Sequence, residues 1–213
     1  MNWKKFLIPI FASLIFSHAE AHVISIYKHP IEWTENRVQL MREYSLEHYG
    51  REMTEIEPRA IVVHWTASAT LESVFNTFYP ESMYDGTLNV ASHFVVDRNG
   101  KIYQLTPETV LNRHAIGYNW CAIGIENVGG VNGEEDLTDA QLAANINLIS
   151  HMKAKYPSIE YVFGHYQQDV ARESGLYIEL VPDYYAEKID PGAKFMRGLR
   201  EAFSKSDLKF FPE

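Results

Sequence analysis

Two histidines and one aspartate occupy positions where a folded chain could bring them together. His64 follows the apolar run 60–63 and His165 follows the run 161–164, so each histidine ends a strand-like segment. Asp190 stands in a third segment, directly before the sharp turn formed by Pro191 and Gly192. Two imidazoles and one carboxylate from separate elements match the three-ligand, open-position pattern of a catalytic zinc site. The sequence therefore suggests His64, His165 and Asp190 as ligands of one zinc ion.

The elements that must position these residues follow from apolar periodicity, caps and turns. Thr34 and Thr138 can cap helices, and the latter forms a capping box with Gln141. Helices are expected at 34–49, 70–78, 138–156 and 193–203. Strands are expected at 60–63, 92–96, 101–105, 122–126 and 161–164. Asn99-Gly100 predicts a hairpin between the second and third strands. This order predicts an α/β fold with a central mixed sheet flanked by helices.

Length and composition predict one globular domain after an export signal. The chain has 213 residues, of which 46% are hydrophobic and 22% charged, enough for a sizeable core. Lys4 and Lys5 precede the apolar run 6–16, which is too short to span a bilayer and leads to a small-x-small cleavage pattern ending at Ala21. We expect a signal peptide at 1–21 rather than an uncleaved anchor, then an N-terminal helical extension at 22–57 and a zinc-binding domain at 58–213.

The net charge and the cysteine content limit which binding partners and covalent attachments are expected. Removal of Lys4, Lys5 and Glu20 with the signal peptide takes the formal charge from −9 to −10, which disfavours nucleic acid and anionic lipid as partners. Cys121 is the only cysteine, so neither a disulfide nor a lipid-attachment cysteine after the signal is expected. The mature protein is expected to be an exported, periplasmic or secreted bacterial protein, monomeric and without stable membrane insertion.

Five segments with distinctive residues follow one another along most of the chain. The second of them leads into the hairpin, and the third reads Arg-His-Ala-Ile-Gly. The segments are 61–67, 91–96 with 100–104, 113–117, 123–126, and 164–165 with 188–192. In this order they resemble the zinc-dependent N-acetylmuramoyl-L-alanine amidases related to peptidoglycan recognition proteins, from which the expected zinc amidase domain at 58–213 follows. One such segment would be weak evidence, whereas five in order are strong.

The resemblance implies a role for each matching residue. It places the zinc ligands at His64, His165 and Asp190, and the acidic general base at Glu126. It gives Lys188 the role of stabilising the tetrahedral oxyanion. It also implies that Trp65, His114 and Asn127 contact the substrate, whereas His93 is expected to be a core or supporting histidine.

A long stretch, 166–187, separates His165 from Lys188 and departs from the family pattern. A loop of this length in a compact domain is usually functional or carries its own structure, so it could form a wall of the substrate groove. Asp169 and Asp183 lie in this stretch, and either could in principle supply the third metal ligand. Asp190 is preferred because its Pro-Gly turn and nearby lysine are the family's own context.

The expected function is hydrolysis of the amide between N-acetylmuramic acid and the L-alanine of the stem peptide, in peptidoglycan or muropeptides. One alternative is a binding protein of the same fold that recognises wall fragments without turnover. A second is an exported antibacterial amidase toxin, and a third is a metal-dependent amide hydrolase that acts on another secreted peptide. Retention of all three ligands, Glu126 and Lys188 favours an enzyme over a binding protein.

Overall fold

A six-stranded mixed sheet forms the centre of the protein, and the computed structural model describes residues 24–212 of it. The spatial order of the strands is β1-β4-β3-β5-β2-β6. Their bounds are β1 Ile26–Lys28, β2 Ala60–Trp65, β3 Phe94–Val96, β4 Ile102–Gln104, β5 Ala122–Asn127 and β6 Tyr161–Gly164. Only β3 and β4 pair antiparallel, as the hairpin predicted around Asn99-Gly100. The predicted α/β class with a mixed sheet is thereby confirmed.

The two faces of the sheet differ because side chains alternate along each strand. In β2 and β5, Ile61, Val63, Ile123 and Ile125 belong to the main hydrophobic core and are 0% exposed. The opposite face of the same strands carries the even-numbered residues, which are small near the start of each strand and polar near its end. These are Ala60, Val62 and His64 in β2 and Ala122, Gly124 and Glu126 in β5. The polar face of the central strands is therefore where chemistry can be placed.

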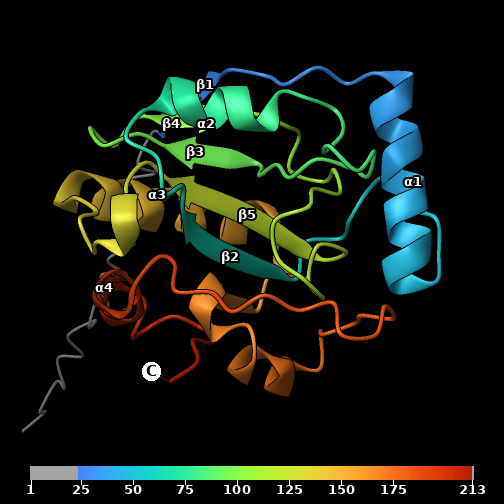
Figure 1. Cartoon of the computed structure of the whole chain (residues 1–213). Coiled ribbons are helices and arrows are strands. Elements are labelled where there is room, and N and C mark those ends of the chain that lie inside the picture. Colours follow the sequence, from blue (N-terminus) through green and yellow to red (C-terminus); the bar gives the residue numbers. More distant parts are fainter. Residues whose placement is uncertain (1–23, 213) are drawn as a thin grey trace, which may run out of the picture.

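Among residues 24–212, four α-helices lie around the sheet, as Figure 1 illustrates. They are α1 Glu35–Tyr49, α2 Leu71–Phe78, α3 Asp139–Lys155 and α4 Ala193–Ala202. Leu148, Ile149 and Leu199 place α3 and α4 against the main core, and the predicted capping box of Thr138 and Gln141 begins α3. Val74 and Phe78 of α2 pack with Val95, a residue of the other face. Figure 1 shows α1 standing across the end of the sheet where β2 and β5 begin.

The α1 helix is joined to the rest of the domain by buried polar contacts. Arg37 is 1% exposed, and its Nη2 donates to the carbonyls of Tyr79 and Pro80 at 2.7 and 3.0 Å. A buried guanidinium is tolerated where hydrogen bonds replace its hydration. At the other end of the helix, Leu180 N donates to the carbonyl of His48 at 3.0 Å. The helix is thus held against both the domain and the 166–187 stretch.

The structure adds to the elements expected from sequence in three places. Strand β1 lies in a segment predicted only as a helical extension, and it pairs with β4. Strands β2 and β5 continue through Trp65 and Asn127, because their ladder includes the pairs His64–Glu126 and Trp65–Asn127. Three short 3-10 helices also form, at Val131–Gly133, His165–Gln167 and Val170–Ser174.

The predicted signal peptide at 1–21 lies outside the described residues. Among residues 24–212, no helix combines the length and apolarity needed to cross a bilayer.

Candidate active site

Three side chains from distant parts of the sequence form a compact donor cluster. The Nδ1 atoms of His64 and His165 lie 3.0 Å apart, and Oδ2 of Asp190 lies 3.0 Å from the first and 3.2 Å from the second. All three residues are buried. The structure therefore brings together the residues that the sequence singled out as metal ligands.

Backbone pairing fixes two members of the cluster and a loop contact fixes the third. Strands β2 and β6 are parallel neighbours paired through Val63 and Gly164, so the histidine that follows each pair emerges at the same edge. Asp190 is held beside His165 because the N–H of Tyr166 donates to the Asp190 carbonyl at 2.8 Å. Two donors are thus placed by the register of the sheet and the third by a backbone hydrogen bond.

His114 determines which nitrogen of His64 faces the cluster. Its Nε2 lies 3.1 Å from the carbonyl of Ala122, which can only accept, so Nε2 carries the proton. Burial first, and then the neighbouring imidazoles, hold the pKa of His114 well below its usual value, so the ring is neutral and its Nδ1 is an acceptor. That Nδ1 lies 3.1 Å from Nε2 of His64. His64 therefore donates from Nε2 and presents the lone pair of Nδ1 to the cluster.

Gly124 and Asn119 hold His114 in this position. A Cβ on Gly124 would lie 2.9 Å from the His114 ring, so only glycine lets the ring rest on β5. The side-chain oxygen of Asn119 accepts from the backbone N–H groups of His114 and Ala115 at 2.8 and 2.7 Å. The glycine of the Ile-Gly-Ile-Glu segment and this buried asparagine thus support a histidine that contacts a cluster residue.

Glu126 stands on β5 directly opposite His64 in the strand register. It is 9% exposed, and its Oε2 is buried with no hydrogen-bond partner among the described residues. Burial, followed by the charge of Asp190, raises the pKa of Glu126 to about 7 against the opposing effects of His64 and Lys188. A carboxyl group that titrates near neutrality and is not committed to the protein is suited to accept and return a proton.

Lys188 reaches the same centre from the other side. It is partly buried and lines a groove of about 230 Å³ that also exposes His114 and His165. Its charge is near enough to Glu126 to lower the pKa of that carboxyl. A fixed ammonium at this position can stabilise negative charge that develops above the cluster.

Two further residues predicted to contact the substrate, Asn127 and Trp65, are buried in the structure. Asn127 is 0% exposed; its Nδ2 donates to the carbonyl of His64 at 3.0 Å, and its Oδ1 accepts from Asn145 of α3 at 2.7 Å. Trp65 is 8% exposed and packs under Gly130, where a Cβ would lie 2.2 Å from the indole. Trp65 follows His64, and Asn127 follows Glu126. Because side chains alternate along a strand, both residues point to the opposite face, where Asn127 contacts α3 and Trp65 contacts the loop at Gly130. Of the three predicted contacts, only His114 lines the groove.

His93 lies behind the site, where the sequence placed a supporting histidine. It is 0% exposed, its Nε2 donates to the carbonyl of Val110 at 2.8 Å, and its Nδ1 accepts from the N–H of Gly124 at 2.9 Å. Burial lowers the pKa of His93 to about 4, so the ring is neutral. Its ring meets that of His114 edge to face, with centroids 5.8 Å apart.

The alternative ligands in the 166–187 stretch lie away from the cluster. Asp169 is exposed and pairs with Arg172 at 3.2 Å, and it also accepts from the Tyr185 hydroxyl at 2.9 Å. Asp183 is exposed in a turn with a positive φ of 58°. The stretch instead walls the groove, through Tyr184, Tyr185 and Ala186.

Sequence reasoning did not single out three residues that shape the groove. Tyr44 of α1, Arg113 and Tyr184 all line it, although they are 40 or more positions apart in the chain. The Arg113 guanidinium donates to the Tyr184 hydroxyl at 2.7 Å. Arg113 was visible in the Arg-His-Ala-Ile-Gly segment, but no sequence signal joins it to a tyrosine of α1.

The donor cluster fits zinc. Metal bonds of about 2.0–2.2 Å in a tetrahedron place ligand atoms about 3.3 Å apart, close to the separations found here. His64 directs Nδ1 at the cluster because its Nε2 is engaged by His114, and Asp190 supplies a buried carboxyl oxygen beside it. Two imidazoles with one carboxylate leave a fourth position of a tetrahedral ion for a reactant.

Comparisons with known proteins agree on one family. Residues 54–193 match the family model described as N-acetylmuramoyl-L-alanine amidase. The endolysin of Klebsiella phage KP32 is 30% identical over 105 residues, which are 47% of this chain and 70% of the endolysin.

Solved structures share the fold. N-acetylmuramoyl-L-alanine amidase LysC from Clostridium intestinale superposes with a TM-score of 0.58 at 21% identity, covering 88% of this chain and all of LysC. The human recognition protein PGRP-IBETAC, solved with glycosamyl muramyl pentapeptide, gives 0.50 at 20% identity, covering 76% of this chain and 91% of the human protein.

Proposed function

The chain belongs to the N-acetylmuramoyl-L-alanine amidase family, and from that premise we propose that it uses zinc to cleave the bond between the lactyl group of N-acetylmuramic acid and L-alanine. The family makes it a peptidoglycan amidase. The zinc dependence rests on one observation, the convergence of His64, His165 and Asp190 with donor atoms 3.0–3.2 Å apart. The three residues would hold the ion, which when bound supplies Lewis acidity toward a carbonyl oxygen and a water molecule.

Glu126 would carry the proton through the reaction. It accepts a proton from the attacking water as the new C–O bond forms, and it returns that proton to the alanine nitrogen as the C–N bond breaks. Its burial and its lack of hydrogen-bond partners support this role. The products are a muramyl carboxylate and a stem peptide with a free amino terminus.

Lys188 and His114 would assist without exchanging protons with the substrate. The ammonium of Lys188 faces the groove beside His165 and would stabilise the oxyanion of the tetrahedral intermediate. His114 would keep the Nδ1 lone pair of His64 directed at the cluster. Such a supporting hydrogen bond fixes the tautomer and the ring orientation of a ligating histidine.

The substrate would lie in the groove lined by Arg113, His114, Tyr184 and Lys188. The human protein of the same fold was solved with a muramyl pentapeptide, which supports a muramyl peptide as the ligand of such a groove. We extend the proposal to export of a monomeric enzyme to the periplasm or the medium, where peptidoglycan is accessible.

The decisive experiment measures zinc content and product release together. Purified protein with zinc is expected to release stem peptides with a free L-alanine terminus from muropeptides, as detected by mass spectrometry. Asp190→Ala is expected to lose both zinc and activity, whereas Asp169→Ala and Asp183→Ala, which change aspartates outside the cluster, keep both. Full zinc retention in Asp190→Ala would refute the ligand assignment. Absence of any product, under conditions in which a known amidase is active, would refute the reaction.

A further inference from the structure

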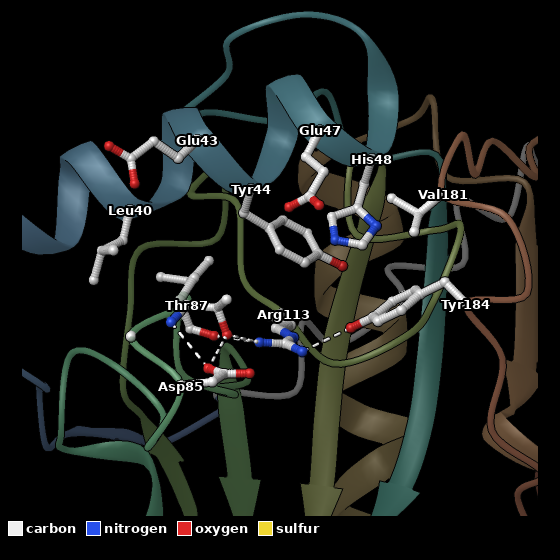
Figure 2. A pocket seen from close by; sticks show the side chains of 12 residues that line it. Leu40, Glu43, Tyr44, Glu47, His48, Asp85, Thr87, Arg113, Val181 and Tyr184 are labelled. Atoms are coloured by element: carbon white, nitrogen blue, oxygen red, sulfur yellow. Dashed lines mark hydrogen bonds between the residues drawn. The ribbon is translucent and has the colours of Figure 1, made fainter.

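The α1 helix lies outside residues 54–193, which match the family model, yet one of its side chains reaches the groups that support the donor cluster. Tyr44, on α1, is 4% exposed. It stands in the wall between the groove and a second hollow of about 290 Å³, which Glu47 and Asp85 also line (Figure 2). Because this wall reaches the groove, a change in Tyr44 can affect the reaction centre.

Protein groups hold the Tyr44 ring on two sides. The ring of His48 lies at a centroid distance of 4.1 Å, and the Arg113 guanidinium lies 5.4 Å from the centroid of Tyr44. Figure 2 shows the Tyr44 side chain extending from α1 toward Arg113. Since both neighbours are themselves hydrogen-bonded, to Glu179 and to Tyr184, the hydroxyl of Tyr44 is kept in a defined place.

Asn119 connects this hydroxyl to the backbone of His114. Its Oδ1 accepts from the N–H groups of His114 and Ala115 at 2.8 and 2.7 Å, and these groups can only donate, so the orientation of the amide is fixed. Its Nδ2 donates to the Tyr44 hydroxyl at 3.0 Å. Asn119 is 1% exposed, so loss of the hydroxyl would remove the acceptor from a buried donor.

His114 continues the connection to the donor cluster. The position of its backbone decides where its ring lies, and Nδ1 of that ring accepts from Nε2 of His64 at 3.1 Å. A chain of hydrogen bonds therefore leads from Tyr44 through Asn119 and His114 to His64. A ligating histidine binds its metal more tightly when its other nitrogen is held, because the ring orientation and the tautomer are then fixed.

We propose that Tyr44 is a positioning residue of the metal site, acting through Asn119 and His114, so that α1 contributes to zinc affinity without supplying a ligand. The inference rests on the proposed function, because it concerns a site that holds zinc. Contact of Tyr44 with a substrate in the groove would leave the zinc affinity of the free enzyme unchanged. Zinc binding in the absence of substrate therefore separates the two roles.

Tyr44→Phe keeps the ring and removes the acceptor of Asn119. Its zinc affinity, measured by chelator competition without substrate, is expected to fall about fivefold, less than for loss of a residue that touches the ligand itself. Tyr103→Phe, the same change on β4, where the ring meets that of Tyr27, is the control and is expected to bind zinc as the wild type does. Wild-type affinity in Tyr44→Phe would overturn the proposal.

A double-mutant cycle tests the route of the effect. In a His114→Ala background the connection to His64 is already broken, so Tyr44→Phe is expected to cause no further loss of zinc affinity. A further loss of about fivefold would show that Tyr44 acts by stabilising the fold in general, and it would refute the route through His114.

Amide hydrogen exchange of His114 gives a measurement that needs no zinc. Because Asn119 accepts from this N–H, its exchange in the zinc-free protein is expected to be about tenfold faster in Tyr44→Phe and unchanged in Tyr103→Phe. If the wild type binds no zinc, the proposed function fails and this exchange rate decides the positioning alone. Faster exchange in Tyr44→Phe supports it, and an unchanged rate rejects it.

Discussion

His64 and Glu126 stand opposite each other on two central strands, whereas Glu47 and Asp85 face each other from a helix and a turn at the rim of the same groove. The first pair is buried and fixed by the hydrogen-bond ladder of the sheet. The second is exposed and depends on how α1 and the 166–187 stretch are held. The family match covers residues 54–193 and so includes β2 and β5 but not α1.

This difference places the two pairs in different electrostatic environments. Desolvation raises the pKa of Glu126 and strengthens every electrostatic interaction around the donor cluster, as proton transfer and oxyanion stabilisation require. Carboxylates at the rim stay exposed to solvent, so each contributes little to stability and can be exchanged without disturbing the core.

Glu126→Gln is expected to have the largest effect, because it removes the proton carrier and keeps the side-chain volume. Turnover should fall about 10³-fold, within the range that general acid-base groups contribute. Zinc content should remain at the wild-type level, since Glu126 is not a member of the donor cluster. Loss of zinc would show that the carboxylate supports the metal instead, and activity near wild type would exclude it as the proton carrier.

His93 should make the buried region sensitive to acid. Its pKa of about 4 in the folded protein lies below about 6.5 in the unfolded chain, so the unfolded state binds the proton more readily. The stability that the neutral ring contributes is present above pH 6.5 and is lost as the pH falls toward 4, by about 3 kcal/mol.

Urea unfolding of wild type and His93→Gln at pH 7.5 and 4.5 measures this loss. The variant cannot titrate at this position. The difference between its free energies of unfolding at the two pH values should therefore be smaller than the wild-type difference by about 3 kcal/mol. If the wild type and the variant lose the same free energy of unfolding between pH 7.5 and 4.5, His93 does not govern the loss of stability in acid.

His114→Ala tests the support of the donor cluster. Without its Nδ1 acceptor, the orientation and tautomer of His64 are no longer held, and zinc affinity should fall about 10- to 100-fold. Chelator competition measures the affinity, and His114→Asn, which can restore an acceptor near Nδ1, should recover part of it. His151→Ala, at an exposed position on α3, is the control and should bind zinc as the wild type does. If His114→Ala binds zinc as tightly as the wild type does, His114 lines the groove but does not support the donor cluster.

Glu179→Gln should have the smallest effect. It tests how much the contact between His48 and Glu179 contributes to holding α1 against the 166–187 stretch. Glutamine can still accept from Nδ1 of His48 and from the N–H of Val181, so only the charge of the buried pair is lost, at about 1 kcal/mol of stability. Chemical denaturation, with the exposed Glu173→Gln as the matched control, measures the difference. A loss of several kcal/mol would mean that this pair, and not the surrounding packing, holds α1 to the 166–187 stretch.

The sequence by itself determined the elements and the residues of the donor cluster. Apolar runs, threonine caps and the Asn-Gly turn are local signals, and among residues 24–212 they located the four α-helices and five of the six strands. His64, His165 and Asp190 were recognised because each stands in a motif of several residues that resembles a known family. Strand β1 escaped notice because three residues carry too little periodicity to be distinguished from a loop.

Only the tertiary structure decided on which face of the strands each side chain lies and which distant segments meet. Asn127 and Trp65 adjoin site residues in sequence, yet the pleat turns them to the opposite side. The link from His114 to His64, and the pocket in which α1 meets Asp85 and Tyr184, join residues 37 to 144 positions apart. Such contacts depend on sheet register and on loop packing, and neither leaves a periodic signal along the chain.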